Sequence, residues 1–356
     1  MLRIIFYILP FMTCLFWFVT FALRSRSNDS AKRVLTVFLG TCTVLYLCHA
    51  FFFLTEELPV WADSIWGLCS LSVYPLYFIY ITHLTCRPLT KGQTAMCLLP
   101  GLLVALAMLI CPGEEVGTVR KLVNAVQIIC VIYFGYRRLH AFDKEVANIY
   151  ADTEGRDTSA VKILLIAFTA ISILSVVVNM AGRQYFASSE WLLMMLSLLF
   201  ASLLYSLSYI GFIRDFSCEQ FLKDTDGEDE GQIPAGEINY NDLRRKIDEL
   251  MDSHYYLNPN IKINDLVSMT GYCRTYVSTY INRTYNCSFS DYVNQLRVRH
   301  AQNLLKDDPE MKVAAIVEMV GFANENSFYR NFRKFAGMTP SDWADAVRKG
   351  KVPEES

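Results

Sequence analysis

The sequence contains no recognisable set of catalytic residues. It has no nucleophile spaced to meet a base, no glycine-rich phosphate-binding loop and no group of metal-ligating side chains. Its eleven cysteines show neither metal-ligand spacing nor the framework of a small secreted domain. These absences favour a protein that is not an enzyme and uses no cofactor or metal, and whose cysteines are small buried apolar residues.

Charge is scarce over residues 1–214, which contain long apolar runs. The chain of 356 residues is 53% hydrophobic and has a mean hydropathy of +0.25, which is high for a soluble protein. A run of about 20 apolar residues can cross a bilayer as a helix. We therefore expect an N-terminal bundle of seven membrane-spanning helices at residues 4–23, 34–54, 64–85, 94–112, 122–136, 161–181 and 190–213.

The loops between these spans alternate in charge. The first, third and fifth loops are basic, whereas the second and fourth carry glutamates. Because basic loops face the cytoplasm, we expect an external N-terminus and a cytoplasmic C-terminus in a bacterial inner membrane. A cleaved signal peptide would reverse every later loop, so the charges argue against cleavage. The spans carry no arginine-rich voltage-sensor helix and no charged relay, so a pump or channel has little support.

A few polar side chains lie within the spans, where a bilayer penalises them. They are candidates for a signal-sensing site, and the alternative is that each bonds to a neighbouring helix and only holds the bundle together. Three tryptophans, Trp61, Trp66 and Trp191, lie at outer boundaries and are typical of an aromatic belt. The polar candidates are His49, His83, Asn124, Gln127 and Asn179.

Residues 215–238 differ from both of their neighbours. Acidic residues cluster there with glycine and proline, a composition that cannot bury a core. We expect an acidic flexible linker that acts as a solvated tether.

A segment near the C-terminus occurs twice. Residues 262–272, KINDLVSMTGY, return as residues 312–322, KVAAIVEMVGF, with the apolar positions, the glycine and the following aromatic residue retained. A short helix, a glycine turn and a second helix are typical of a helix-turn-helix, and two in tandem favour binding to double-stranded DNA. Between them we expect a helix from about Phe289 to Leu305, roughly 25 Å long. Such a spacer could set two recognition helices near one turn of DNA apart, about 34 Å.

The second helix of each repeat is the expected recognition helix. In the first, Val277 and Ile281 should face inward, and Phe328 and Phe332 are their counterparts in the second. Outward polar side chains there suit base edges, although polar residues on any exposed helix look similar. The base-contact candidates are Arg274, Thr275, Ser278, Thr279, Asn324, Asn326, Ser327 and Arg330. The phosphate-contact candidates are Lys262, Arg283, Lys312, Arg333 and Lys334.

The residues that follow the second glycine carry a resemblance to a known family. Gly321-Phe322, the run SFYRNFRKF at residues 327–335 and GMTPSDW at residues 337–343 resemble the signature of AraC/XylS-type transcription regulators. The resemblance covers about residues 240–348 and implies a seven-helix domain with two helix-turn-helix units. The N-terminal half does not resemble the sugar-binding barrel common in that family, so no sugar ligand is implied.

Together these patterns predict an all-α protein in four parts. They are a transmembrane bundle (1–214), an acidic linker (215–238), an AraC-like DNA-binding domain (239–348) and a tail (349–356). We interpret the chain as a membrane-tethered, sequence-specific transcription regulator that senses an unknown signal. Its expected partners are double-stranded DNA, the lipid membrane, RNA polymerase, a signal ligand or membrane partner, and a second copy in a homodimer. The alternatives are a transporter or membrane enzyme with an appended regulatory domain, and a passive anchor released by proteolysis.

Overall fold

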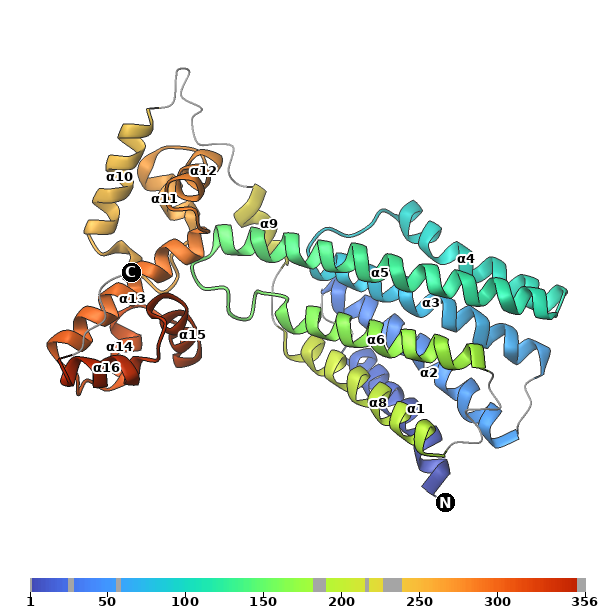
Figure 1. The fold of residues 1–356 in the computed structure, drawn as a ribbon. Helices are drawn as coiled ribbons and strands as arrows, with labels where there is room; N and C mark the ends of the chain where they lie inside the picture. The colour runs from blue at the N-terminus through green and yellow to red at the C-terminus, as the bar shows by residue number, and fades with distance from the viewer. Residues whose placement is uncertain are drawn as a thin grey trace. The chain divides into compact units, whose positions relative to one another are not determined.

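The chain folds into two compact units (Figure 1). The computed structural model describes residues 2–24, 29–55, 59–181, 190–214, 218–226 and 239–350. We call Met1–Ala141 together with Thr158–Cys218 the bundle, and Phe142–Asp157 together with Glu219–Ser356 the C-terminal unit. Over the described residues the regular structure is helical apart from one isolated antiparallel bridge between Tyr150 and Lys262. The all-α prediction is therefore confirmed.

Long helices occupy all seven positions predicted to span a membrane. Within the described residues, apolar segments of α2, α3, α4, α5 and α8 are long enough to cross a membrane, whereas those of α1 and α6 are shorter, Ile8–Leu23 and Ser159–Leu174. The helices are α1 (Leu2–Leu23), α2 (Ser30–Thr55), α3 (Val60–Leu84), α4 (Lys91–Ile110), α5 (Glu114–Ile149), α6 (Ser159–Ala181) and α8 (Glu190–Ile213).

Helix α5 is much longer than the predicted span at residues 122–136. It has 36 residues and continues through Arg137 and Arg138 to Ile149. The sequence has no proline between Pro112 and the end of this helix, so nothing in the backbone forces it to stop. The boundary between the two units falls within this helix, after Ala141.

The bundle is built on pairs of adjacent helices. Helix α1 packs against α2 and α8, α2 against α3, α3 against α4, and α6 against α8. The shared core is rich in fully buried aromatic and aliphatic side chains, including Leu35, Phe38, Tyr77 and Tyr80.

In the middle of α5, apolar side chains are exposed and polar side chains are buried, which is the opposite of a helix in a soluble protein. Leu122, Val126 and Ile129 are 63%, 59% and 64% exposed. On another face, Asn124 and Gln127 have side-chain atoms that are buried and have no hydrogen-bond partner. Apolar residues outside and polar residues inside fit a helix whose surroundings are themselves apolar.

Two of the cysteines are not simply buried apolar residues. Cys86 and Cys218 form a disulfide within the bundle, across 132 residues of sequence. This pair cannot be predicted from the sequence, because neither a motif nor a short spacing joins the two residues. Among the free cysteines, Cys14, Cys42, Cys69 and Cys273 are buried, as the sequence interpretation expected, whereas Cys111 and Cys130 are exposed and contradict it.

The C-terminal unit contains the seven helices that the family resemblance implied. A short 3-10 turn, Tyr255–Leu257, follows the first of them. The seven are α10 (Tyr240–Asp252), α11 (Ile263–Thr270), α12 (Arg274–Tyr285), α13 (Phe289–Asp307), α14 (Val313–Met319), α15 (Glu325–Ala336) and α16 (Pro340–Arg348).

Local sequence explains where these helices begin and end. Four of them start at a side chain that accepts a hydrogen bond from the backbone N–H three residues later, which satisfies one free donor. Helices α11 and α15 end at Gly271 and Gly337, both in the left-handed conformation that favours glycine. The four N-cap residues are Asn239, Ser288, Asn324 and Thr339.

Helix α13 connects two hydrophobic cores. Its N-terminal half, with Phe289 and Val293, packs into the core of the first repeat around Leu266 and Ile281. Its C-terminal half, with Val298 and Leu305, packs into the core of the second, around Phe328, Phe332 and Trp343. The repeated segments are therefore two similar subdomains on one shared helix, as the sequence predicted.

Part of the expected linker is folded. Residues Cys218–Asp226 form helix α9, and its Phe221 is 1% exposed and packs on Phe142. The composition of 215–238 as a whole did not predict this, because one buried aromatic residue is hidden among many acidic ones. Residues 215–217 and 227–238 of that segment lie outside the described residues.

Candidate nucleic-acid interface

Helix α12 exposes one of its four predicted base-contact residues fully and the other three in part. Val277 and Ile281 are fully buried, as expected. Thr275 is exposed, while Arg274, Ser278 and Thr279 are half-buried. Exposed Asn282 donates a hydrogen bond from Nδ2 to Ser278 Oγ at 3.2 Å. The first repeat therefore carries a surface of short polar groups and one arginine, which are side chains able to pair with base edges.

Helix α15 corrects part of the prediction for the second repeat. Asn326 and Arg330 are exposed, as expected. Ser327 is only 3% exposed, because it lies beside Phe328 on the buried side of the helix, so its hydroxyl is not available to a base. Asn324 is exposed but serves as the N-cap, with Oδ1 accepting from the Ser327 N–H at 2.9 Å. The surface of the second repeat thus centres on Asn326 and Arg330.

Three of the predicted phosphate-contact residues are exposed, and the other two form ion pairs with acidic side chains. Arg283, Lys312 and Arg333 are exposed. Lys334 Nζ lies 2.6 Å from the carboxylate of Asp291, an ion pair that connects α15 to α13. The fifth, Lys262, has Nζ 2.7 Å from the Asp224 carboxylate of α9.

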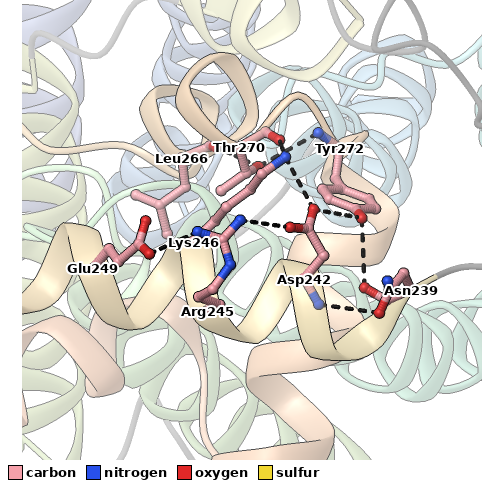
Figure 2. Close-up of polar contacts among 8 residues, drawn as sticks. All are labelled: Asn239, Asp242, Arg245, Lys246, Glu249, Leu266, Thr270 and Tyr272. Atoms are coloured by element: carbon pink, nitrogen blue, oxygen red, sulfur yellow. Dashed lines mark hydrogen bonds and ion pairs between the residues drawn. The ribbon is translucent and has the colours of Figure 1, made fainter.

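Helix α10 contacts the turn of the first helix-turn-helix (Figure 2). Lys246 Nζ donates to the Thr270 carbonyl at 3.0 Å and pairs with the Asp242 carboxylate at 3.0 Å. The hydroxyl of Tyr272, the aromatic residue that follows the glycine turn, donates to Asp242 at 3.1 Å. Hydrogen bonds from Arg245 and Lys246 lower the pKa of Asp242 to about 2. This network holds the turn between α11 and α12 in place.

The corresponding aromatic residue of the second repeat, Phe322, lies beneath a buried arginine. The Arg297 guanidinium is 5.5 Å from the Phe322 ring centre and is fully buried. It donates from Nε to the Tyr256 carbonyl at 2.8 Å and from Nη2 to the Asn258 carbonyl at 2.7 Å. Burial lowers its pKa to about 10, so the group stays charged at neutral pH. Arg297 thereby joins the two repeats.

The two glycine turns differ in their surroundings. Both Gly271 and Gly321 have a positive φ, 76° and 77°. A side chain on Gly271 would meet no atom within 4 Å, whereas one on Gly321 would overlap the carbonyl oxygen of Leu257. The second turn therefore requires glycine for close packing as well as for its backbone conformation.

Three of the polar residues predicted for signal sensing lie in one region of the bundle. His49 lies close to the buried Trp66, and Asn124 and Gln127 lie on helix α5. The His49 ring centre is 5.7 Å from Trp66, and Arg120 lies 4.2 Å above the same ring. Asn124 and Gln127 follow Arg120 along α5 at helical spacing. Of this group, Arg120 also lines a pocket of about 360 Å³, together with Val60, Asp63, Met108, Pro112, Gly113 and Gly117.

The remaining predictions for the bundle have different outcomes. Trp66 is 5% exposed, so its place is inside the bundle and not in an aromatic belt, whereas Trp61 and Trp191 are 62% and 78% exposed. His83 lies in the last turn of α3, where its Nδ1 is buried without a hydrogen-bond partner. The side chain of Asn179 lies outside the described residues.

Sequence reasoning did not find one set of contacts to the first repeat. Tyr150 and Ala151, which directly follow α5, and Asp224 of α9 bond to it at several points. The signal available in sequence was weak, because a single tyrosine, alanine or aspartate outside the repeated segments is not distinctive.

Comparisons with known proteins agree with this geometry. A family model described as a helix-turn-helix domain matches residues 266–346. The chain is 25% identical over 95 residues to the Msm operon regulatory protein of Streptococcus mutans, covering 27% of this chain and 34% of that protein. It is 35% identical over 68 residues to the uncharacterised HTH-type transcriptional regulator YijO of Escherichia coli, covering 19% and 24%. No solved structure matches the chain.

A further relative helps to delimit the similarity. The probable transcription factor PqrA of Proteus vulgaris is 24% identical over 104 residues, which are 29% of this chain but 82% of that protein. The chain spans about a third or less of the length of the Msm and YijO proteins. The C-terminal part of the chain is thus a helix-turn-helix domain of the AraC type found in transcription regulators.

Proposed function

We propose that the protein is a membrane-tethered transcription regulator that binds specific DNA through α12 and α15. The observation that carries this proposal is the pair of similar subdomains on the shared helix α13, each with an exposed polar face on its second helix. The two faces differ, with Arg274 and Thr275 on one and Asn326 and Arg330 on the other. Unequal faces on one rigid support suit an asymmetric DNA site.

The membrane part of the proposal is supported by the reversed polarity of α5. Exposed leucine, valine and isoleucine side chains on a helix with inward amides are costly in water and favourable in lipid. The charge pattern of the loops favours a C-terminal unit in the cytoplasm, where bacterial DNA is.

The group around Trp66 is the best candidate for a signal site. It combines His49, Arg120 and the neighbouring pocket with the buried amides of Asn124 and Gln127. Buried polar groups within a bundle are expensive unless they bind something, so a polar ligand would stabilise one arrangement of these helices.

The test uses the full chain reconstituted in lipid nanodiscs. Binding to the DNA upstream of its own gene is compared with binding to a scrambled fragment, and genome-wide mapping of bound DNA in cells identifies further sites. Selective binding by membrane-embedded protein supports the proposal. Equal binding to all sequences, or recovery of the chain from the soluble fraction, contradicts it.

A further inference from the structure

The C-terminal unit incorporates a segment from outside the family domain. Residues Phe142–Asp157 lie between α5 and α6 in sequence, yet they belong to the same compact unit as α10 to α16. Within this segment, Ala151 is fully buried and is part of the core of the first repeat, with Leu266 and Ile281. The loop is therefore built into that core.

Polar side chains of α13 form a socket for the backbone at Ala151. The Ala151 carbonyl accepts hydrogen bonds from Ser290 Oγ at 2.7 Å and from Asn294 Nδ2 at 3.0 Å. Both donors are buried, 6% and 4% exposed. The Ala151 N–H donates to the Ile261 carbonyl at 3.3 Å. Buried donors such as these are costly without a partner, so the socket fits a carbonyl at this position.

The carboxylate of Asp224 on α9 forms an ion pair with the neighbouring side chain of Lys262. One carboxylate oxygen accepts from Lys262 Nζ at 2.7 Å and from the Tyr150 hydroxyl at 2.6 Å. The side chains of Lys262 and Asp224 are only 25% and 17% exposed, so solvent screens this pair less than a surface pair. The ion pair and the bridge between Tyr150 and Lys262 thus fix one edge of the first repeat.

The backbone of α9 makes further contacts to the same edge. The Asp224 carbonyl accepts from Asn264 Nδ2 at 3.0 Å and from Arg274 Nη1 at 3.3 Å. This carbonyl lies in the last turn of α9, where the helix dipole adds negative potential. A carboxylate and a carbonyl at a helix C-terminus are thus presented to Lys262 and Arg274, two groups that would otherwise attract a DNA phosphate or base.

We infer that residues 150–152 and α9 form an inhibitory clamp on the first helix-turn-helix, and that DNA and Asp224 compete for Lys262 and Arg274. The inference rests on the proposed function and adds its regulation. The contacts of the clamp are made to the first repeat, whereas Lys312, the counterpart of Lys262 in the second repeat, is exposed. A clamped protein would bind DNA through α15 alone, and release of the clamp would add the contacts of α12.

The first test measures DNA affinity with the full chain in nanodiscs. A random-sequence DNA library is selected with wild type and with Asp224→Asn, and the enriched DNA serves as the probe. Asp224→Asn removes the charge that holds Lys262 and keeps the shape of the side chain. It should bind the probe at least about fivefold more tightly than wild type, the lower end of common coupling between sites.

A matched control is available on the same helix. Glu219 is exposed and pairs with Lys223 on α9, so Glu219→Gln should leave the affinity at the wild-type value. If Asp224→Asn binds no more tightly than wild type while Arg330→Ala weakens binding, the clamp is wrong and the proposed function stands. If neither the wild-type chain nor Asp224→Asn enriches any sequence from the library, the proposed function fails and the inference fails with it.

A second measurement does not depend on any variant. Hydrogen exchange is followed in the wild-type protein with and without saturating probe DNA. Competition predicts that the amide of Ala151 and those of α9 exchange faster when DNA is bound, because the clamp is displaced. Unchanged or slower exchange at these amides with DNA bound would overturn the inference.

Discussion

The guanidinium of Arg297 lies over the ring of Phe322, so a cation on α13 meets the aromatic residue that ends the turn of the second repeat. The same guanidinium holds the carbonyls of Tyr256 and Asn258 from the segment before the first repeat. Because these groups come from both subdomains, Arg297 sets how the two recognition helices are held.

Replacing Arg297 by lysine should destabilise the C-terminal unit by about 3 kcal/mol, because a single ammonium cannot satisfy both buried carbonyls. Hydrogen exchange of amides within 239–350 in the full chain measures the free energy of opening. Arg299, exposed on the same helix, provides the control, since Arg299→Lys should change little. Equal effects of the two substitutions would show that the buried contacts contribute nothing.

The glycine turns provide a comparison between equivalent positions. Gly271→Ala should cost about 1–2 kcal/mol, the usual penalty for a left-handed alanine. Gly321→Ala should cost clearly more, because its methyl group would also overlap the Leu257 carbonyl. The same exchange measurement compares the two variants, and a smaller loss for Gly321→Ala than for Gly271→Ala would contradict the packing described for the second turn.

DNA binding should depend on the exposed arginine of α15. Arg330→Ala should weaken binding to a specific site by about 1–3 kcal/mol and relax selectivity at one base pair. Arg348→Ala is the control, because Arg348 pairs with Glu310 and Asp345 on the surface of the second subdomain. Fluorescence anisotropy on matched and mismatched DNA gives both affinities. A uniform loss across all sequences would make Arg330 a phosphate contact instead.

The proposed orientation can be tested with an existing cysteine. Cys111 is exposed directly after α4, at the end of the predicted span 94–112 that is expected to face the outside. A membrane-impermeant maleimide should label it in intact cells, and Cys111→Ser should remove that signal. Cys287, in the C-terminal unit, should react only after the cells are permeabilised. Labelling of Cys287 in intact cells would contradict the proposed topology and indicate the opposite orientation.

Acid should loosen the network around Asp242. Its folded-state pKa, about 2, is below the ordinary value of 3.8, so the unfolded chain binds more protons between these values. The contribution of Asp242 is therefore complete above about pH 4 and is lost as the pH falls towards 2. Unfolding of the C-terminal unit followed by circular dichroism should show a flatter pH dependence for Asp242→Asn. An unchanged slope would mean that the network does not stabilise the fold.

Sequence predicted the local features well and the long-range contacts poorly. The inward positions of α12, Val277 and Ile281, follow from helical periodicity and are buried in the structure. The polarity of Ser327 predicts a surface position, but the helix places it beside Phe328 on the buried side. Trp66 was assigned to the lipid boundary because of its position, and its packing on His49 depends on a different helix.

The contacts of Ala151 show a further limit. Nothing about an alanine after an amphipathic helix indicates that its carbonyl fills a socket on α13, more than a hundred residues later. Such pairings depend on the tertiary fold and leave no periodic trace in one sequence.

The incorporation of residues 142–157 into the C-terminal unit also bears on how that unit could be liberated. A single protease cut within residues 227–238 would break the covalent connection, yet α9 and the loop at Ala151 would still hold the cleaved product by hydrogen bonds, an ion pair and a shared core. Cleavage alone would therefore leave the fragment bound to the remainder of the chain. A second event that dissociates these contacts would be needed before the fragment could diffuse to distant DNA.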